Sequence, residues 1–358
     1  MKVALVYDRV NKWGGAERVL LGLHKIFPEA PLYTSVYNPI FASWAKIFNI
    51  KVSFLQNFPF AQVRHELYAL LMPMAFESFS FNEYDLVISV TSESAKGIIT
   101  KPHTKHICIC LTPTRYLWSG YKEYFTNGFF KFVSTPFVMY LRWWDIIASD
   151  RPDAFIAISK EVQRRIKKYY QQDSNVIYPP LMLSPKQVDK KNKAKSYFLI
   201  VSRLSQFTSY KRVDLAIQAA NKLRIQLKIV GEGDIQHFKK MAGETVEFLG
   251  KVPDEVLESL YINAKALIFP GLEDFGLVMV EAQSFGTPVI AYKAGGALEI
   301  VQEGKTGELF EKQTVASLTQ VLEKFDEKKY NRRSCIENAD KFSFIQFKTA
   351  LQSYLHKL

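Results

Sequence analysis

The sequence contains little cysteine and little histidine, which limits the metal and redox chemistry open to it. Three cysteines and six histidines occur in 358 residues. Cys108 and Cys110 alternate along one predicted strand, Cys335 lies far from both, and no two cysteines form a C-x-x-C pair. We therefore predict reduced thiols, as in a cytoplasmic protein, and no metal site built from cysteine.

The sequence also lacks a long apolar run. Its longest uncharged stretch, residues 30–45, is shorter than a transmembrane helix and contains Pro31 and Pro39. The chain starts on an apolar strand at residues 2–7, so we predict no signal peptide. With 48% apolar and 23% charged residues, the composition is that of a folded globular protein, and the length predicts two domains.

Positive charge and aromatic rings are abundant instead. The net charge is +12, and 14% of the residues are aromatic. Basic residues gather at 160–168 and 186–195, and aromatic residues gather at 54–81 and 116–144. This combination favours polyanionic partners, which are nucleotide phosphates, nucleic acid or an anionic membrane surface. Core aromatics beside a solvated basic face are the alternative interpretation.

Strand and helix patterns alternate along the whole chain, which predicts an α/β fold with parallel sheets. The alternation comes in two runs, and their boundary lies near residues 179–195. We predict two tandem doubly wound, Rossmann-like units that face a cleft, because ligands of such sheets bind at the carboxyl ends of strands. The expected strands are 2–7, 31–37, 52–55, 86–90, 106–111, 154–158, 176–178, 198–201, 227–230, 246–249, 267–269 and 288–292, and the main expected helices are 16–27, 160–170, 213–223, 254–262 and 277–285.

The most informative segment is residues 270–281, where Glu273 and Glu281 flank a glycine loop and the start of an apolar helix. Glu273 is expected in the loop after a strand, and Glu281 about one turn into the helix. The backbone N–H groups of Phe275, Gly276 and Leu277 would lie at the helix N-terminus, where an anion such as a diphosphate is favoured. An N-capping acid beside a partly buried glutamate is the structural alternative.

Further residues of suitable chemistry follow other strands. Gly14 and Gly15 lie between the first strand and its helix, where glycine lets the backbone approach a ligand closely. Arg203 and Lys211 follow the first strand of the second run and can neutralise a diphosphate together, although each alone also fits a surface cation. Glycines at 231 and 233 form a similar turn after the next strand.

Taken together, these segments resemble the retaining glycosyltransferases of family 4, which have the two-domain GT-B fold. The resemblance covers nearly the whole chain and is densest in the second half. Two further segments, 112–118 and 176–180, are similar to a bacterial subgroup that includes mannosyltransferases of O-antigen and capsule assembly. The motifs that carry the resemblance are at 202–216, 230–233, 273–281, 286–290 and 294–301.

The resemblance implies an acceptor domain at residues 1–180, to which a final helix at 342–358 crosses back, and a donor domain at 181–341. It implies that a nucleotide-diphosphate sugar binds without a metal or other cofactor. Arg203 and Lys211 match the cations that hold the diphosphate, Glu273 the acid near the transferred sugar, and Glu281 the acid on the ribose hydroxyls. The remaining donor residues implied are Gly15, Gly231, Gly233, Val252, Phe275, Gly276 and Leu277, and the acceptor-side residues are Gly14, Arg115, Tyr116 and Trp118.

The expected reaction is transfer of a hexose, with mannose from GDP-mannose favoured, to a glycan acceptor that is lipid-linked. The protein is then expected in the cytoplasm, at the inner face of the membrane and in contact with anionic lipid, without a nucleic-acid partner. Leu111 stands where relatives in the subgroup carry a histidine that contacts the donor sugar. A different sugar, a substitute histidine (His103 or His106) or weakened activity would each follow from that departure.

Two other functions stay open at this point. One is a nucleotide-sugar isomerase on the same fold, against which the intact set of Arg203, Lys211 and Glu281 argues. The other is a catalytically silent partner that binds a sugar nucleotide within a glycan-assembly complex, which Leu111 motivates. A nucleic-acid-binding role is the least favoured, because the diagnostic basic residues lie at predicted strand ends.

Overall fold

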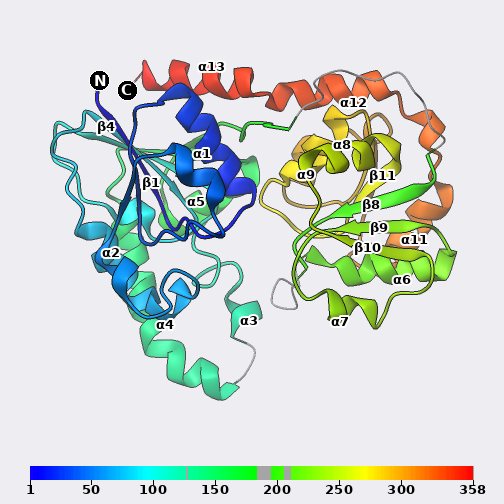
Figure 1. Cartoon of the computed structure of the whole chain (residues 1–358), viewed down its shortest axis with the longest axis horizontal. Coiled ribbons are helices and arrows are strands. Elements are labelled where there is room, and N and C mark those ends of the chain that lie inside the picture. The colour runs from blue at the N-terminus through cyan, green and yellow to red at the C-terminus, as the bar shows by residue number, and fades with distance from the viewer. Residues whose placement is uncertain (126–127, 184–194, 205–210, 358) are drawn as a thin grey trace. The chain divides into compact units, whose positions relative to one another are not determined.

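The computed structural model describes residues 1–125, 128–183, 195–204 and 211–357 (Figure 1). The chain divides into two compact units. Unit 1 comprises Met1–Pro179 with Ala350–Leu358, and unit 2 comprises Pro180–Thr349. Each unit contains one parallel β-sheet with helices packed on it, which confirms the predicted α/β class and the two Rossmann-like units.

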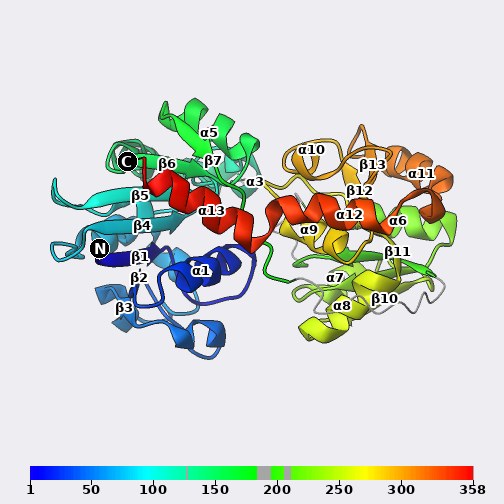
Figure 2. The same cartoon turned by 90° about the horizontal axis from the view of Figure 1, so that it is seen from above.

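Unit 1 is built on a seven-stranded parallel sheet with the order β3-β2-β1-β4-β5-β6-β7. Figure 2 shows the strands of this sheet side by side in this order. The central strands are buried along their length, as parallel strands covered on both faces must be. The strands are β1 Val3–Tyr7, β2 Leu32–Thr34, β3 Ile50–Val52, β4 Leu86–Thr91, β5 Lys105–Cys110, β6 Ala154–Ala157 and β7 Ser174–Val176.

The helices of unit 1 differ in how they begin and end. In α5, Lys160–Tyr170, the Ser159 hydroxyl caps the N-terminus by accepting from the Val162 N–H at 3.0 Å, and Gln171 closes the helix in the left-handed conformation. The long helix α4, Gly128–Ser149, contains Pro136. The others are α1 Gly15–Ile26, α2 Met72–Glu77, α3 Tyr121–Tyr124 and the 3₁₀ helices η1 Ser43–Ile47, η2 Phe54–Asn57, η3 His65–Leu71 and η4 Ala95–Gly97.

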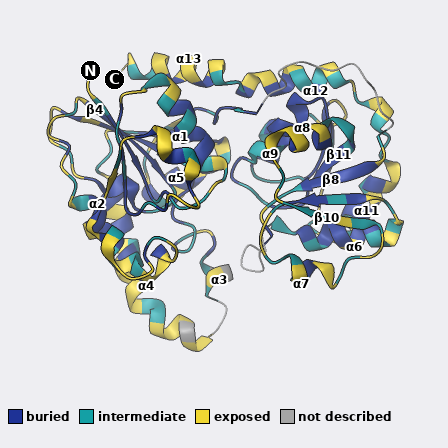
Figure 3. Cartoon of the chain, in the orientation of Figure 1, coloured by how far each residue is buried: buried dark blue, intermediate teal, exposed yellow. Residues whose placement is uncertain are grey.

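Unit 2 is built on a six-stranded parallel sheet with the order β10-β9-β8-β11-β12-β13. Its core is apolar and is formed by residues of the sheet together with α6 and α11. Figure 3 shows the central strands of this sheet as buried. The strands are β8 Tyr197–Val201, β9 Leu227–Val230, β10 Val246–Gly250, β11 Ala264–Phe269, β12 Val289–Tyr292 and β13 Gly307–Phe310. The helices are α6 Val213–Leu223, α7 Ile235–Lys239, α8 Asp254–Asn263, α9 Leu277–Ser284, α10 Ala297–Ile300, α11 Val315–Lys324 and α12 Arg332–Ala339, with η6 Glu327–Lys329 and η7 Asp340–Phe342. The last helix, α13 Phe344–Leu355, begins in unit 2, and its residues from Ala350 on belong to unit 1.

Several expected elements are placed differently in the structure. The strand expected at 52–55 lies earlier, at Ile50–Val52, because Ser53 caps a 3₁₀ helix at Phe54–Asn57. The strand expected at 176–178 lies at Ser174–Val176, since the following Pro179 and Pro180 have no N–H to donate to the ladder. Neither β13 nor α4 was predicted. The lysine-rich boundary at 186–195 lies almost entirely outside the described residues.

Two glycines let the ends of β8 and β9 approach each other closely. Gly231 and Gly233 have φ values of 147° and 133°, in the left-handed region that disfavours side chains. A Cβ on Gly233 would lie 1.7 Å from the Leu204 carbonyl oxygen, and one on Gly231 would lie 1.8 Å from that of Ser202. The Leu204 N–H donates to the Glu232 carbonyl at 2.8 Å. These contacts fix the backbone around Arg203.

Replacing Gly233 by alanine should destabilise unit 2 by about 2 kcal/mol or more, because the new Cβ meets a backbone carbonyl in a disfavoured conformation. Gly304→Ala is the matched control, since Gly304 has a φ of 73° but nothing within 4 Å of an added Cβ; its cost should be about 1 kcal/mol. Urea unfolding followed by circular dichroism measures both. All five tryptophans lie in unit 1, so their fluorescence transition should not shift, and equal losses in the two variants would contradict the packing argument.

Candidate functional site

Each sheet has one point where the strand order reverses direction. In unit 1 it lies between β1 and β4, and in unit 2 between β8 and β11. Doubly wound sheets bind ligands at this point, beyond the carboxyl ends of the strands. The polar residues that follow these four strands are therefore the first candidates for ligand-binding or catalytic residues.

The unit 2 switch point carries an ion pair between two residues that the sequence singled out. The Lys211 ammonium contacts the Glu273 carboxylate, and both side chains are partly buried. Lys211 precedes α6 on the β8 side, and Glu273 follows β11. Arg203 follows β8 directly, is exposed, and forms no ion pair with a residue that the structure describes. Two cations and a carboxylate therefore gather at the end of β8 and β11.

The N-terminus of α9 lies in the same loop. Gly276 precedes the helix with φ 93°, and the first-turn N–H groups at Leu277 and beyond have no carbonyl four residues earlier in the helix to bond. The loop is held from outside by Gly295 and Gly296, since the Gly296 N–H donates to the Glu273 carbonyl at 3.0 Å. A Cβ on Gly296 would lie 2.0 Å from the Phe275 carbonyl oxygen, so only glycine allows this approach. Phe275 itself is buried, edge-on to Phe342.

Glu281 lies on the buried side of α9. Its Oε2 accepts a hydrogen bond from the Tyr261 hydroxyl at 3.1 Å, and the Tyr261 ring stacks on Phe285 at 5.6 Å between centroids. The side chain of Glu281 is almost inaccessible to solvent. Tyr261 thus orients a carboxylate that the sequence had assigned to a ligand, and this partner was not foreseen.

The other donor-side positions line the same edge of the sheet. Val252 follows β10 and is half-buried, and Gly231 donates its N–H to the Gly250 carbonyl at 2.9 Å. Lys251 and Glu232 form an exposed pair at 3.6 Å. Gly231 and Gly233 thus serve the packing of strand ends, and their predicted contact with a donor stays a prediction.

In unit 1, Asp8 ties the two strands of the switch point together. Its carboxylate accepts from the Thr91 hydroxyl at 2.8 Å and from the N–H groups of Ser92 at 2.7 Å and Ala95 at 2.9 Å. Asp8 follows β1, Thr91 is the last residue of β4, and Ser92 and Ala95 follow it. A buried carboxylate that accepts several hydrogen bonds fixes the loop that bears them.

Two further carboxylates lie beside this loop. Glu93 pairs with Arg9 at 2.6 Å, and burial raises the pKa of Glu93 although Arg9 opposes the shift. Glu17 accepts from the Tyr7 hydroxyl at 2.7 Å, and burial together with the Glu17 charge raises the pKa of that hydroxyl. Gly14 lies just before α1 and Gly15 is its first residue. The predicted glycine turn therefore adjoins a buried polar network.

The sequence analysis offered His103 or His106 as a substitute for the histidine that relatives carry in place of Leu111. His106 is buried in β5, where its Nε2 lies 2.8 Å from the Ser89 hydroxyl, and His103 lies before the start of the same strand, at the opposite end from Leu111. Neither can act at the carboxyl edge. His65, which the sequence analysis did not consider, lies 3.3 Å from the Asn11 amide in the loop after β1. Burial, with Arg9 and Lys12, lowers the pKa of His65 to about 2.

The segment 112–118 is tied to α4 through Asp145. This buried carboxylate pairs with Lys96 at 2.5 Å, accepts from the Thr114 hydroxyl at 3.0 Å and from the Trp118 indole at 2.7 Å, and also accepts from Tyr170 at 2.8 Å. Trp118 further stacks on Tyr169. The indole N–H of Trp118 is therefore already bonded to Asp145 within unit 1. Arg115 and Tyr116 are half-buried nearby, and their predicted acceptor role stays a prediction.

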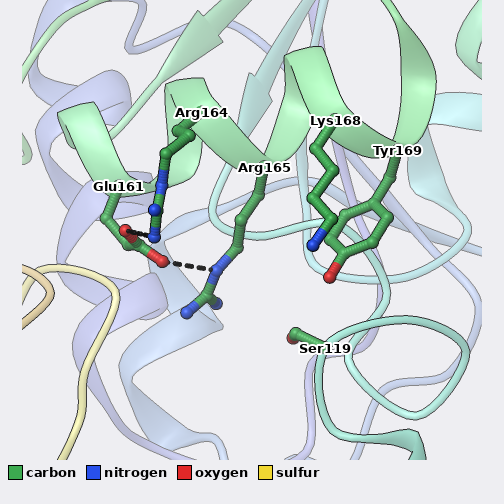
Figure 4. A pocket seen from close by; sticks show the side chains of 6 residues that line it. All are labelled: Ser119, Glu161, Arg164, Arg165, Lys168 and Tyr169. Atoms are coloured by element: carbon green, nitrogen blue, oxygen red, sulfur yellow. Dashed lines mark hydrogen bonds and ion pairs between the residues drawn. The ribbon is translucent and has the colours of Figure 1, made fainter.

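One face of α5 forms a basic pocket of about 250 Å³ with the loop that follows β5. Figure 4 shows Arg164, Arg165 and Lys168 extending from α5 toward the Ser119 loop. Glu161 pairs with Arg164 at 2.6 Å and with Arg165 at 2.9 Å. Three cations and one carboxylate leave an excess of positive charge that favours an anion. The pocket is lined by Ser119, Glu161, Arg164, Arg165, Lys168 and Tyr169.

Comparison with known families identifies the second half of the chain. Residues 184–342 match the family described as glycosyl transferases group 1. Unit 2 is thus similar to a glycosyl transferases group 1 domain. The predicted resemblance to glycosyltransferases is confirmed at this level. The group 1 domain contains the Lys211–Glu273 pair, Arg203, Glu281 and the glycines at the carboxyl edge of the sheet.

Individual relatives match in part. An uncharacterized glycosyltransferase of Methanocaldococcus jannaschii, MJ1178, is 27% identical over 210 residues, which are 56% of this chain and 58% of that one. A GDP-mannose-dependent alpha-mannosyltransferase of Corynebacterium glutamicum is 31% identical over 114 residues, 31% of this chain and 27% of that one. The chain thus spans less than two thirds of either. The crystal structure of Anabaena Alr3699/HepE in complex with UDP-glucose shares the fold, with a TM-score of 0.73, 19% identity and full coverage of both chains.

Within the described residues, metal-binding clusters and membrane-spanning helices are absent. No group of three or more His, Cys, Asp or Glu side chains there is arranged to hold a metal ion. No helix in the described ranges is long and apolar enough to cross a membrane. The buried residues Asp8, Glu93, His65 and Asp145 were all missed by the sequence analysis, because each is recognised only by partners distant in the chain.

Acid should destabilise unit 1, because His106 is buried in its neutral form. Burial lowers its pKa from 6.5 to about 3, so the unfolded state binds the proton first. The stabilisation is full above pH 6.5 and is lost as the pH falls toward 3, at up to about 1.4 kcal/mol per pH unit. Urea unfolding by tryptophan fluorescence between pH 7 and 4 measures this slope. His106→Asn should flatten it and the exposed-site control His103→Asn should not, whereas identical slopes would show that His106 is not responsible.

Proposed function

We propose that the protein is a glycosyltransferase that moves a hexose from a nucleotide-diphosphate sugar to a glycan acceptor. The observation that carries this proposal is the arrangement in the group 1 domain, where Lys211 and Glu273 meet beside the N-terminus of α9 and Arg203 follows the adjacent strand. A diphosphate needs cations and free backbone N–H groups, and a sugar needs carboxylates that accept from its hydroxyls. All three kinds of group lie at this switch point.

The proposed chemistry follows from where charge develops. When the bond from the sugar to the diphosphate breaks, negative charge grows on the leaving phosphate and positive charge on the sugar. Arg203, Lys211 and the N-terminus of α9 stabilise the leaving group, so the cations of the protein take the role that a metal has elsewhere. Glu273, now paired with Lys211, becomes available to the sugar when Lys211 turns to the phosphate. The acceptor hydroxyl attacks from the face that the phosphate leaves and gives its proton to the leaving phosphate, so the product keeps the configuration of the donor.

GDP-mannose is the donor that we favour. Support comes from the sequence likeness of segments 112–118 and 176–180 to mannosyltransferases and from the partial match to a GDP-mannose-dependent enzyme. Leu111 makes the sugar site differ from that of relatives with histidine there. UDP-glucose, which is bound in a structure of the same fold, is the alternative donor.

The acceptor that we propose is a lipid-linked glycan at the cytoplasmic face of the membrane. The basic pocket on α5 supports an acceptor that carries phosphate, because it presents Arg164, Arg165 and Lys168 against a single carboxylate. The pocket adjoins the segments that follow β5 and β6, which is the edge where ligands of such sheets bind. Contact of unit 1 with anionic lipid would bring the acceptor to this edge.

A silent sugar-nucleotide-binding partner is the second candidate, and Leu111 is the feature that favours it. Binding of nucleotide without turnover, with turnover appearing in Leu111→His, would support it. A nucleotide-sugar isomerase differs in consuming the donor without any acceptor.

Nucleoside diphosphate should raise the melting temperature of unit 2 only when the carboxyl edge is intact. We expect stabilisation by one of GDP and UDP, by about 2.7 kcal/mol at a hundred times the dissociation constant. Glu281→Gln, which keeps a hydrogen-bonding group for Tyr261 but removes the charge, should weaken binding about tenfold or more, because charged partners contribute about 1.5–3 kcal/mol. The measurement is calorimetric titration with differential scanning calorimetry.

Glu255→Gln on the exposed surface of α8 is the matched control, and it should bind like the wild type. If neither nucleotide binds, or if Glu281→Gln binds as tightly as the control, the donor site is not at this edge and the proposal fails.

Transfer should continue in excess EDTA, and the product should keep the anomeric configuration of the donor. NMR of the transferred sugar measures both, since its anomeric signal reports turnover and its one-bond C1–H1 coupling distinguishes the two anomers. Lys211→Gln should lower kcat by about a hundredfold, as loss of one group that stabilises developing charge does. Inversion of configuration, or complete loss of turnover in EDTA that Mg²⁺ restores, would contradict the mechanism.

A further inference from the structure

We propose that Phe342 is a positioning residue for the loop that bears Glu273, and that it couples this loop to both segments by which the chain passes between the units. The donor loop is residues 270–276, between β11 and α9. The first connecting segment is residues 180–183 and the second is residues 340–349, because the chain passes between the units after Pro179 and after Thr349. The use of this loop for a nucleotide sugar rests on the proposed function, whereas its positioning is a property of unit 2.

The donor loop contains a glycine near each of its ends, so contacts with the rest of unit 2 must fix its backbone. Gly271 is its second residue, and Gly276 adopts a φ of 93° before α9. The Phe275 side chain enters the fold and is 3% exposed. It lies between Glu273, which pairs with Lys211, and the first turn of α9. The place of the Phe275 ring therefore influences both the carboxylate and the helix N-terminus.

Phe342 contacts this ring from the second connecting segment. The centroids of the Phe275 and Phe342 rings are 5.4 Å apart and their planes are inclined at 69°, which is an edge-to-face arrangement. Phe342 is the last residue of η7 and is 4% exposed. Because both rings are buried in a close-packed interior, neither can move far without opening a cavity. The position of Phe342 thus restrains the donor loop.

The backbone of Phe342 also holds the first connecting segment. The Leu181 N–H donates to the Phe342 carbonyl at 2.7 Å, and Leu181 forms a parallel bridge with Ser343. Leu181 and Leu183 are both buried. The two connecting segments are therefore joined to each other at the residue whose ring contacts the donor loop.

The far end of α9 is attached to the same part of the chain. The Asn338 amide of α12, which leads into η7, donates to Gln283 Oε1 at 2.7 Å, and both side chains are buried. The Ser284 hydroxyl lies 3.5 Å from the Leu183 carbonyl oxygen. The helix that offers its N-terminus to a diphosphate is thus held at both ends by residues that lead out of unit 2.

Amide hydrogen exchange of the ligand-free chain tests the positioning. The reporters are the N–H groups of Met279 and Gly296, which donate to the donor-loop carbonyls of Gly276 at 2.9 Å and Glu273 at 3.0 Å. In Phe342→Leu both amides should exchange about threefold to tenfold faster, which is the range that loss of one aromatic pair contact allows.

Phe198→Leu is the matched control. Phe198 is a buried phenylalanine of unit 2, 5% exposed, with an edge-to-face partner in Phe325 at 5.9 Å. It lies near the start of β8, at the opposite end of the strand from the carboxyl edge. Urea unfolding corrects both variants for loss of overall stability. Equal exchange at Met279 and Gly296 in the two corrected variants would overturn the proposal.

The coupling is tested at Leu181, on the other connection of Phe342. Phe275→Leu should speed exchange of the Leu181 amide about threefold or more, because Phe342 loses the ring against which it packs. The double variant Phe275→Leu/Phe342→Leu should exchange at Leu181 no faster than Phe342→Leu alone, since the two rings act through one contact. Unchanged exchange at Leu181 in Phe275→Leu would reject the coupling.

Calorimetric titration of the same variants with GDP and UDP relates the loop to the proposed function. Phe342→Leu should bind nucleotide about threefold to tenfold more weakly than Phe198→Leu, because part of the binding energy must then order the loop. Equal affinities would overturn the role of Phe342 in donor binding. A wild type that binds neither nucleotide would reject the proposed function, and the exchange of Met279 and Gly296 would still decide whether Phe342 positions the loop.

Discussion

The parallel pairing of β8 with β11 is the constraint on which the candidate donor site depends. Adjacent parallel strands deliver the segments that follow them to the same edge, and at this pair the strand order reverses, so no helix connection covers the gap. The pairing brings Lys211 and Glu273, 62 residues apart, into one ion pair. The pairing of β1 with β4 acts similarly in unit 1, where Asp8 bridges the two strand ends. Each unit thus has a polar site where its own topology predicts one.

Rigid backbone supports the site in unit 2, and buried polar groups support it in unit 1. At Gly233 and Gly296 the backbone of one loop approaches the backbone carbonyl of another more closely than a Cβ would allow. These contacts fix the loops that carry Arg203 and Glu273 in the absence of a ligand. In unit 1 the buried carboxylates Asp8 and Asp145 collect donors from several segments. Asp145 thereby fixes residues 112–118 against α4, beside the apolar contacts of Val138 and Leu141.

Much of this was predictable from sequence, and the reasons for the failures are physical. The strand ends of unit 2 were predicted because apolar runs bounded by glycine and charge mark buried parallel strands, and Lys211 and Glu273 were both singled out. The partner of Glu281 was not predicted, since Tyr261 reaches it only through packing of α8 on α9. In α4 the pattern of apolar residues says that one side differs from the other but not which side is inward. That depends on Lys96 and Tyr170, which lie far away in the chain. His65 and Glu93 were missed for the same reason.

We expect the carboxyl edge of the unit 2 sheet to hold the diphosphate of a nucleotide sugar. A crystal structure of the chain with GDP or UDP would show where the nucleotide binds. The diphosphate should lie within hydrogen-bond distance of Lys211 and Arg203, at the N-terminus of α9, with the ribose directed toward Glu281. Nucleotide bound elsewhere, for example in the basic pocket on α5 of unit 1, with the Lys211–Glu273 pair undisturbed, would contradict it.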